Sequence, residues 1–163
     1  MDYFETFAPV ARLSSVQTIL AIATHNDWEI EMFDFHSAYL NGILDDGKTI
    51  YMEQLPHHEV ANRTHYVLKL RKSLYGLKQA GRKWYNSLCE LLTSIGFQRS
   101  LADPAIFFAH IGGNVVVLFI HVDDTTITGS STSLNKEFKK CISEHFEITD
   151  LGSISWLLGL AIE

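Results

Sequence analysis

Two adjacent carboxylates, Asp123 and Asp124, follow a run of six apolar residues. Residues 115–120 are all strongly apolar and residues 125–128 are all β-branched, so both stretches are predicted strands joined by a tight turn at 121–124. Two like charges at the tip of such a hairpin repel each other and lose hydration, which keeps at least one protonated. A divalent cation removes this conflict, because Mg²⁺ prefers hard carboxylate oxygens and also binds substrate phosphates. The pair therefore indicates a metal site for phosphoryl chemistry; the alternative is a plain Asp-Asp turn between strands.

A third carboxylate, Asp34, ends a stretch in which side chains alternate between two faces. Residues 28–35 place Asp34 on the same face as Trp28, Ile30 and Met32, which are all large and apolar. An unpaired carboxylate in such surroundings is costly, so Asp34 needs a partner or a metal ion. The alternative is a surface Asp at the end of a strand.

Basic residues gather in one segment of an otherwise acidic chain. Five of the thirteen Lys and Arg residues lie within residues 71–83, namely Arg71, Lys72, Lys78, Arg82 and Lys83. Such a local patch could offset phosphates, and Gly76 and Gly81 would let a ligand approach the backbone closely. The alternative is a solvated basic loop.

Three helices and several strands are expected to position these residues. Residue spacing predicts helices near 16–23, 84–95 and 134–145, and strands at 28–35, 49–53, 66–70, 105–109, 115–120 and 125–128. From residue 28 the order is strand, basic loop, helix, strands, helix, strand, which approximates the split βαβ (ferredoxin-like) pattern. The expected fold class is α+β, an antiparallel sheet with helices on one face, within a single domain over residues 1–163.

In this arrangement the strand that ends at Asp34 can lie beside the hairpin that carries Asp123 and Asp124. Three carboxylates would then meet at one edge of the sheet. Two-metal phosphoryl transfer requires such a grouping, with two cations roughly 3.5–4 Å apart. The protein's task in that chemistry is mainly to position the reactants and neutralise charge.

Composition bounds the remaining possibilities. The chain has 163 residues, 47% of them hydrophobic and 20% charged, as expected for a globular domain. The net charge of −6 argues against a free-standing nucleic-acid-binding protein, which is usually basic. Cys89 and Cys141 lack metal-type spacing and are read as reduced thiols of a cytosolic or nuclear protein. No apolar run is long enough to span a membrane, and no targeting signal is recognised at the N-terminus.

Several motifs, taken in order, resemble the reverse transcriptase domain of copia-type LTR retrotransposon Pol polyproteins. They are ETFAPVARL at 5–13, MFDFHSAYLNG at 32–42, IYMEQ at 50–54, LRKSLYGLKQAGRKWY at 70–85, HVDD at 121–124, DLG at 150–152 and WLLGLAIE at 156–163. The resemblance covers essentially the whole chain. It implies a polymerase palm with part of the fingers, and DNA synthesis on RNA or DNA templates. It also implies a location in cytoplasmic virus-like particles or in the nucleus.

The resemblance assigns roles by position. Asp34, Asp123 and Asp124 match the residues that bind two Mg²⁺ ions (or Mn²⁺) and carry catalysis. The residues that match the site of the incoming dNTP are Phe35 through its backbone carbonyl, Tyr39 under the sugar, and Tyr75, Gly76 and Lys78. The residues expected to contact the RNA or DNA template-primer are Arg71, Lys72, Arg82, Lys83, Trp156 and Gly159, the last two from a stretch that resembles the primer-grip turn. The rest of a Pol polyprotein is the other expected partner.

The chain also departs from the family pattern. His121 stands where Tyr is usual before the Asp pair, Gly81 where Pro is usual, and Thr149 where Lys is frequent. The resemblance makes a Lys in this region a candidate proton donor to the leaving pyrophosphate, and Thr149 does not supply its ammonium group. The chain begins near the ETFAPVA segment and ends after WLLGLAIE, so basic fingers, thumb and RNase H region are expected to be absent.

Two hypotheses follow, and they belong to different classes. The first is an RNA-directed DNA polymerase that transfers nucleotides by two-metal catalysis. The second is a catalytically inactive retrotransposon remnant that folds as a palm without extending primers. A third, an unrelated metal-dependent nuclease or cyclase palm, would share the three carboxylates but would not explain LYGLKQ at 74–79 or DLG at 150–152.

Overall fold

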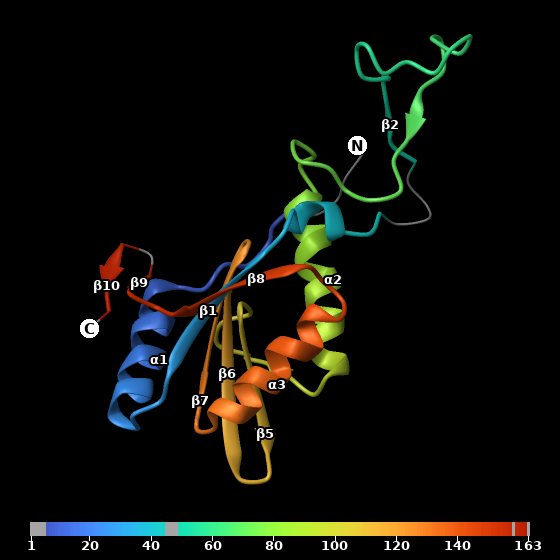
Figure 1. Ribbon diagram of the computed structural model, residues 1–163. Helices are drawn as coiled ribbons and strands as arrows, with labels where there is room; N and C mark the ends of the chain where they lie inside the picture. Colours follow the sequence, from blue (N-terminus) through green and yellow to red (C-terminus); the bar gives the residue numbers. More distant parts are fainter. Residues whose placement is uncertain (1–5, 45–48, 158, 163) are drawn as a thin grey trace.

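A six-stranded antiparallel sheet forms the centre of the protein (Figure 1). The computed structural model describes residues 6–44, 49–157 and 159–162. Across the sheet the order is β4 (Gln98–Arg99), β5 (Ile106–Ile111), β6 (Asn114–His121), β7 (Asp124–Gly129), β1 (Ile30–Phe35) and β8 (Ile148–Ser153). Two small hairpin-like pairs lie outside it: β2 (Tyr51–Met52) with β3 (Leu68–Lys69), and β9 (Trp156–Leu157) with β10 (Leu160–Ala161). The mixed α and β composition and the antiparallel sheet confirm the sequence prediction.

Both faces of this sheet are covered, because its central strand β6 is apolar on both sides. Leu118 and Ile120 point into a cluster with helices α2 (Ala80–Ser94) and α3 (Thr132–Ser143), whereas Phe119 points to the opposite face. That opposite face packs against α1 (Leu13–His25) through Val16 and Ile19. The expectation that all helices lie on one face is therefore correct for α2 and α3 and wrong for α1. Helical spacing in α1 predicts an apolar face but does not say which side of a sheet the helix covers.

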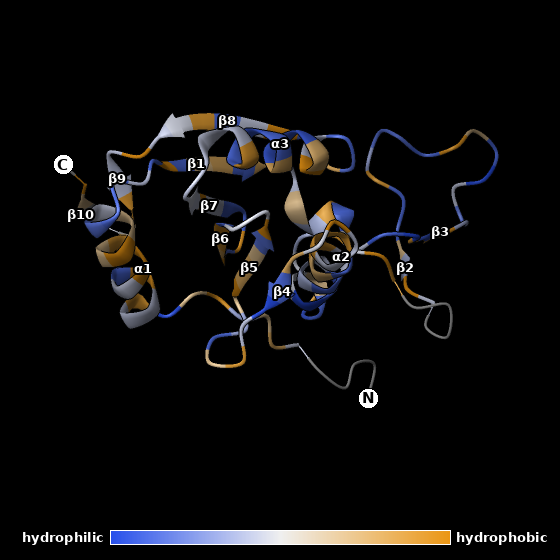
Figure 2. Ribbon diagram, turned by 90° about the horizontal axis from the view of Figure 1, so that it is seen from below, coloured by the Kyte–Doolittle hydropathy of each residue, from blue (hydrophilic) through white to orange (hydrophobic). Residues whose placement is uncertain are grey.

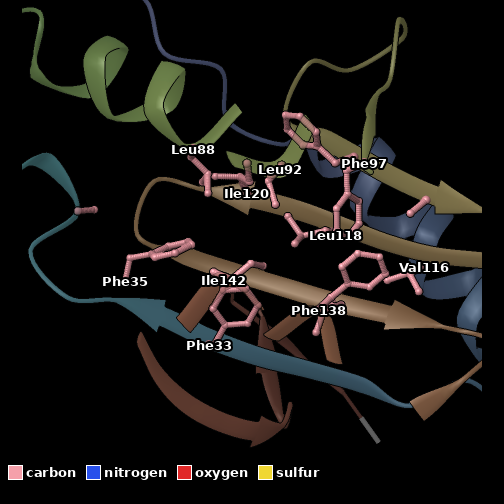
Figure 3. Close-up of a cluster of buried hydrophobic side chains, with 14 of the residues drawn as sticks. Phe33, Phe35, Leu88, Leu92, Phe97, Val116, Leu118, Ile120, Phe138 and Ile142 are labelled. Carbon is pink, nitrogen blue, oxygen red and sulfur yellow. The ribbon is translucent and has the colours of Figure 1, made fainter. Parts of the chain in front are cut away.

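The larger cluster lies between the sheet, α2 and α3 (Figure 3). Phe33 and Phe35 of β1 point into it and their rings meet edge to face at 5.4 Å. The ring of Phe35 also packs edge to face against Trp84 at 4.8 Å. Each fully buried Phe contributes roughly 1.5–3 kcal/mol through burial alone. Since Phe33 and Phe35 flank Asp34, this packing fixes the strand that carries the carboxylate.

None of the described helices is long and apolar enough to cross a membrane. The buried apolar residues of α1, α2 and α3 belong to the clusters that pack against the sheet, and the hydropathy colouring shows both apolar and polar residues along each helix (Figure 2). The apolar surface is therefore used in packing between helices and sheet.

A partly buried ion cluster joins α3 to the edge strand β8. Lys139 donates hydrogen bonds to Glu31 of β1 and, at 2.6 Å, to Asp150 of β8. The second carboxylate oxygen of Asp150 accepts the backbone N–H of Gly152 at 3.0 Å. Gly152 has φ +71°, which suits glycine, and the β1–β8 register shifts between Met32 and Phe33. The DLG motif thus forms a bulge that is tied to α3.

Residues 49–72 project from the sheet as an arm that carries β2 and β3 (Figure 1). At its base, Gly42 follows the 3₁₀ helix η1 (Ala38–Asn41) and lies directly against α2. A Cβ at Gly42 would lie 2.8 Å from the backbone nitrogen of Trp84, so only glycine fits there. The carbonyl of Gly42 accepts a hydrogen bond from the backbone of Ser73 at 2.8 Å. This close contact holds η1 between the arm and α2.

Candidate active site

Asp34 and Asp124 lie directly opposite each other on the neighbouring strands β1 and β7. β6 and β7 pair up to His121 and Asp124, which leaves Val122 and Asp123 as the turn between them. The carbonyl of Asp123 accepts a 3.1 Å hydrogen bond from the backbone of Phe35. The hairpin predicted at 121–124 is confirmed, and all three predicted carboxylates meet at one end of the sheet.

The turn has an unusual backbone conformation that is held by a hydrogen bond from α2. Val122 has φ +62°, a left-handed conformation that costs energy for a β-branched residue. The indole nitrogen of Trp84 donates a 3.0 Å hydrogen bond to the carbonyl of Val122. Trp84 is almost completely buried, so its position is fixed by the core. The strained turn that presents Asp123 is therefore supported by a rigid part of the fold.

The electrostatics at the end of the sheet that carries the three carboxylates favour a bound cation. Desolvation, and then the charge of Asp124, raise the pKa of Asp34. Desolvation, and then the charges of Asp34 and Asp124, raise the pKa of Asp123. One carboxylate oxygen of Asp123, Oδ1, is buried and has no hydrogen-bond partner. Carboxylates that repel each other and leave a buried oxygen unpaired fit a hard divalent cation such as Mg²⁺.

The carboxylates do not by themselves form a closed metal site. Within residues 6–44, 49–157 and 159–162, no three His, Cys, Asp or Glu side chains are grouped so that they could hold a metal ion. A cation at this end would therefore take part of its ligands from outside the carboxylates. Mg²⁺ in proteins characteristically keeps waters and binds substrate phosphates beside one or two carboxylates.

Two tyrosines stand beside the carboxylates. Tyr39 in η1 and Tyr75 have ring centroids 4.9 Å apart. Desolvation and then the negative charge of Asp123 raise the pKa of Tyr75, with smaller effects from Tyr39 and Asp34. The structure thus brings both predicted nucleotide-site tyrosines to the end of the sheet where the carboxylates lie.

The other predicted nucleotide-site residues lie in the connection to α2. Gly76 has φ +93°, which explains a glycine in this turn, and Lys78 follows it with an exposed side chain. Phe35 contributes through its backbone, as expected, since its side chain is buried in the core.

The predicted nucleic-acid contacts are divided between two places. Arg71 and Lys72 are exposed at the base of the arm, where Lys72 pairs with Ile43 in an isolated bridge. Arg82 and Lys83 lie in the first turn of α2, and Arg82 donates a 3.3 Å hydrogen bond to the carbonyl of Phe7.

Trp156 and Gly159, the other two predicted nucleic-acid contacts, lie far from the carboxylates along β1. β8 begins opposite Phe35 and ends opposite Glu31, so the hairpin that follows lies beyond the opposite end of β1 (Figure 1). Trp156 is exposed and Gly159 has φ +83° between β9 and β10. Leu158 lies outside the described residues, as does Glu5 of the N-terminal motif.

Sequence reasoning missed one group beside Asp34. Thr149 of β8 pairs with Asp34, and its hydroxyl shares a hydrogen bond with Nε2 of His36. The other ring nitrogen of His36 lies 3.2 Å from Glu147. The charge of His36 lowers the pKa of Asp34 and so opposes the upward shift that burial causes. The position of His36 two residues after Asp34 was the only available signal, and it did not indicate the contact with β8.

Comparison with known proteins agrees with this geometry. The family model described as "Reverse transcriptase (RNA-dependent DNA polymerase)" matches residues 1–163. The chain is 39% identical over 99% of its length to the retrovirus-related Pol polyprotein from transposon TNT 1-94 of Nicotiana tabacum. It is 38% identical over 98% of its length to the corresponding polyprotein from transposon RE1 of Arabidopsis thaliana.

The chain spans 12% and 11% of these two polyproteins, and no solved structure matches it. A match over the full length of the chain, together with identities near 40%, is sufficient to assign the family. The chain therefore belongs to the reverse transcriptase (RNA-dependent DNA polymerase) family, in the group found in Pol polyproteins of copia-type transposons.

Proposed function

We propose that this chain is a polymerase palm that adds deoxyribonucleotides to a primer 3′-hydroxyl. The observation that carries the proposal is the cross-strand pairing of Asp34 with Asp124, beside a turn that presents Asp123. The order β1, α2, β6, β7, α3, β8, with β6-β7-β1-β8 adjacent and α2 and α3 on one face, supports a split βαβ palm.

Asp34, Asp123 and Asp124 are the residues that would hold Mg²⁺ in this proposal. Bound there, Mg²⁺ supplies Lewis-acid stabilisation of charge on the transferring phosphoryl group. The reaction joins the primer 3′-oxygen to the α-phosphorus of a dNTP and releases pyrophosphate. The chain's own contribution is to hold the carboxylates on two paired strands and a supported turn, so that the reactants meet in a fixed geometry.

The remaining residues fit the substrates of that reaction. Tyr39 would lie under the sugar of the dNTP and exclude a 2′-hydroxyl, which distinguishes ribonucleotides from deoxyribonucleotides. Tyr75, Gly76 and Lys78 would line the same nucleotide site. Basic side chains at the arm base and at the start of α2 would contact template-primer phosphates: Arg71, Lys72, Arg82 and Lys83.

Primer extension on an RNA template with Mg²⁺ or Mn²⁺ tests the proposal. Asp123→Asn removes a proposed ligand charge with little change of shape and should abolish extension. Asp27→Asn makes the same chemical change at an exposed residue with φ +54°, and should leave extension unchanged.

Three outcomes are distinguishable. Metal-dependent extension that is lost only in Asp123→Asn supports the proposal. A folded protein that extends no primer would support the alternative of a non-catalytic remnant. Extension by Asp123→Asn at the same rate as by Asp27→Asn and the parent would show that the carboxylate assignment is wrong.

A further inference from the structure

An apolar cavity of about 150 Å³ lies behind Tyr39. Its walls are the segment 8–10, Tyr39 of η1, the first turns of α2, and Ile120 and Val122 around the end of β6. It therefore lies between the tyrosine at the proposed sugar site and the turn that presents Asp123.

The outer wall of this cavity is fixed at both ends. Arg82 donates a hydrogen bond to the carbonyl of Phe7 on one side of segment 8–10. On the other side, the backbone of Ala11 donates a 3.0 Å hydrogen bond to the carbonyl of Ile120. The cavity is thus preformed by contacts that do not depend on a ligand.

The lining has few polar groups available for a ligand or for water. No residue that lines the cavity is charged. The indole N–H of Trp84 is bonded to Val122, and the hydroxyl of Tyr85 donates a 2.7 Å hydrogen bond to the carbonyl of Pro104. Burial raises the pKa of Tyr85 to about 12, so this wall stays neutral. A buried water needs two to four polar partners, and most of this lining is apolar, which favours an apolar guest over water.

The helix side of the cavity is open because α2 has a glycine there. A Cβ at Gly81 would lie 3.5 Å from Cβ of Ala8 and 3.7 Å from Cε1 of Tyr39, which are ordinary van der Waals distances. A methyl group at this position would therefore enter the space between Ala8 and Tyr39 without displacing them.

We propose that this cavity is a binding site for one small, uncharged, single-ring aromatic molecule. An apolar cavity of about this volume is large enough for one benzene-sized ring. The rings of Tyr39, Trp84 and Tyr85 offer the edges and faces against which an aromatic guest packs favourably. A bound ring would touch both Tyr39 and Val122 and so connect the cavity to the proposed catalytic residues. The inference does not rest on the proposed function, because binding can be measured without catalysis.

Titration of the intact protein with toluene, followed by NMR and calorimetry, tests the proposal. We expect saturable binding on the order of 0.1–1 mM. The indole resonance of Trp84 should shift, whereas those of Trp28 and Trp156, which do not line the cavity, should not. Benzoate, of similar size but charged, should not bind.

Gly81→Met places a flexible apolar side chain in the cavity and should weaken toluene binding by at least about tenfold. Gly81→Ala should weaken it less, and Thr93→Met, at an exposed position of the same helix, should leave it unchanged. If Gly81→Met does not fold, the toluene affinity of Gly81→Ala is compared with that of the parent, and a weaker affinity in the variant supports the proposal. The proposal is overturned if the folded parent does not bind toluene, if the Gly81 variants bind it as tightly as the parent, or if benzoate binds equally well.

Discussion

The indole nitrogen of Trp84 and the carbonyl of Val122 are joined by a 3.0 Å hydrogen bond that links the core to the turn before Asp123. Val122 is held in a left-handed conformation, so this hydrogen bond supports a geometry that the turn would not favour alone. The position of the Asp123 carboxylate therefore depends on a tryptophan in α2.

Trp84→Phe keeps an aromatic ring in the core but removes the hydrogen bond and leaves a small cavity beside Phe35 and Phe146. We expect the free energy of unfolding to fall by about 2–3 kcal/mol, because a partly buried carbonyl loses its donor and the smaller ring fills less of the core. Primer extension should slow by roughly tenfold or more, since small displacements of catalytic groups are costly. Trp28→Phe is the matched control. Extension at the parental rate by a destabilised Trp84→Phe protein would contradict the supporting role.

Asp123→Asn should stabilise the protein at neutral pH in metal-free buffer. A raised native pKa means that the stability contribution of Asp123 is present below pH 3.8 and is lost as the pH rises through its native pKa. The parent therefore carries a penalty at pH 7 that the variant lacks, and we expect a gain of roughly 0.5–1 kcal/mol. Urea unfolding at pH 7 and pH 3.5 measures this, with the two proteins converging at the lower pH. A variant less stable than the parent at pH 7 would show that the carboxylate is favourably paired.

Tyr39→Val should raise ribonucleotide incorporation relative to deoxyribonucleotide incorporation. The ring of Tyr39 packs against Tyr75 beside the carboxylates, where the resemblance places the sugar. We expect the selectivity for dNTP to fall by at least about tenfold in single-nucleotide incorporation assays. Tyr39→Phe keeps the ring and should keep the selectivity. Unchanged selectivity in an active Tyr39→Val protein would show that Tyr39 does not exclude the 2′-hydroxyl of a ribonucleotide.

Lys139→Met should destabilise the fold by roughly 3 kcal/mol, because it leaves the buried Glu31 carboxylate without its partner. The bond to Asp150 contributes less, since that side chain is 54% exposed. Adding Glu31→Gln should recover part of the loss in chemical unfolding experiments. A Lys139→Met protein as stable as the parent would show that the ion cluster is energetically neutral.

The same cluster sets a pH window for stability. Burial alone would lower the pKa of Lys139, but the hydrogen bonds that its ammonium group donates to Asp150 and Glu31 outweigh this effect and raise the pKa above 10.5. Burial would raise the pKa of Asp150, but the hydrogen bond from Lys139 outweighs it and holds the pKa below 3.8. The Asp150 contribution is present above pH 3.8 and is lost as the pH falls through its native pKa. The Lys139 contribution is present below pH 10.5 and is lost as the pH rises through its native pKa.

The carboxylate end could be predicted from sequence because alternation fixes which face each strand residue takes. The apolar run 115–120 and the β-branched run 125–128 on either side of the Asp pair predicted a hairpin, and the apolar neighbours of Asp34 predicted a strand. The contact of His36 with Thr149 could not be predicted, since it joins residues 113 positions apart through the register of β8. Helix–sheet packing likewise decides the face that α1 covers, and no local pattern encodes that choice.

Binding of Mn²⁺, followed by electron paramagnetic resonance, tests the central claim that Asp34, Asp123 and Asp124 supply protein ligands for bound divalent cations. We expect Asp34→Asn and Asp123→Asn each to weaken Mn²⁺ binding by about tenfold or more, whereas Asp27→Asn should not. A dNTP should tighten Mn²⁺ binding in the parent, because its phosphates complete the ligand set. Equal Mn²⁺ affinity in all four proteins would contradict the claim.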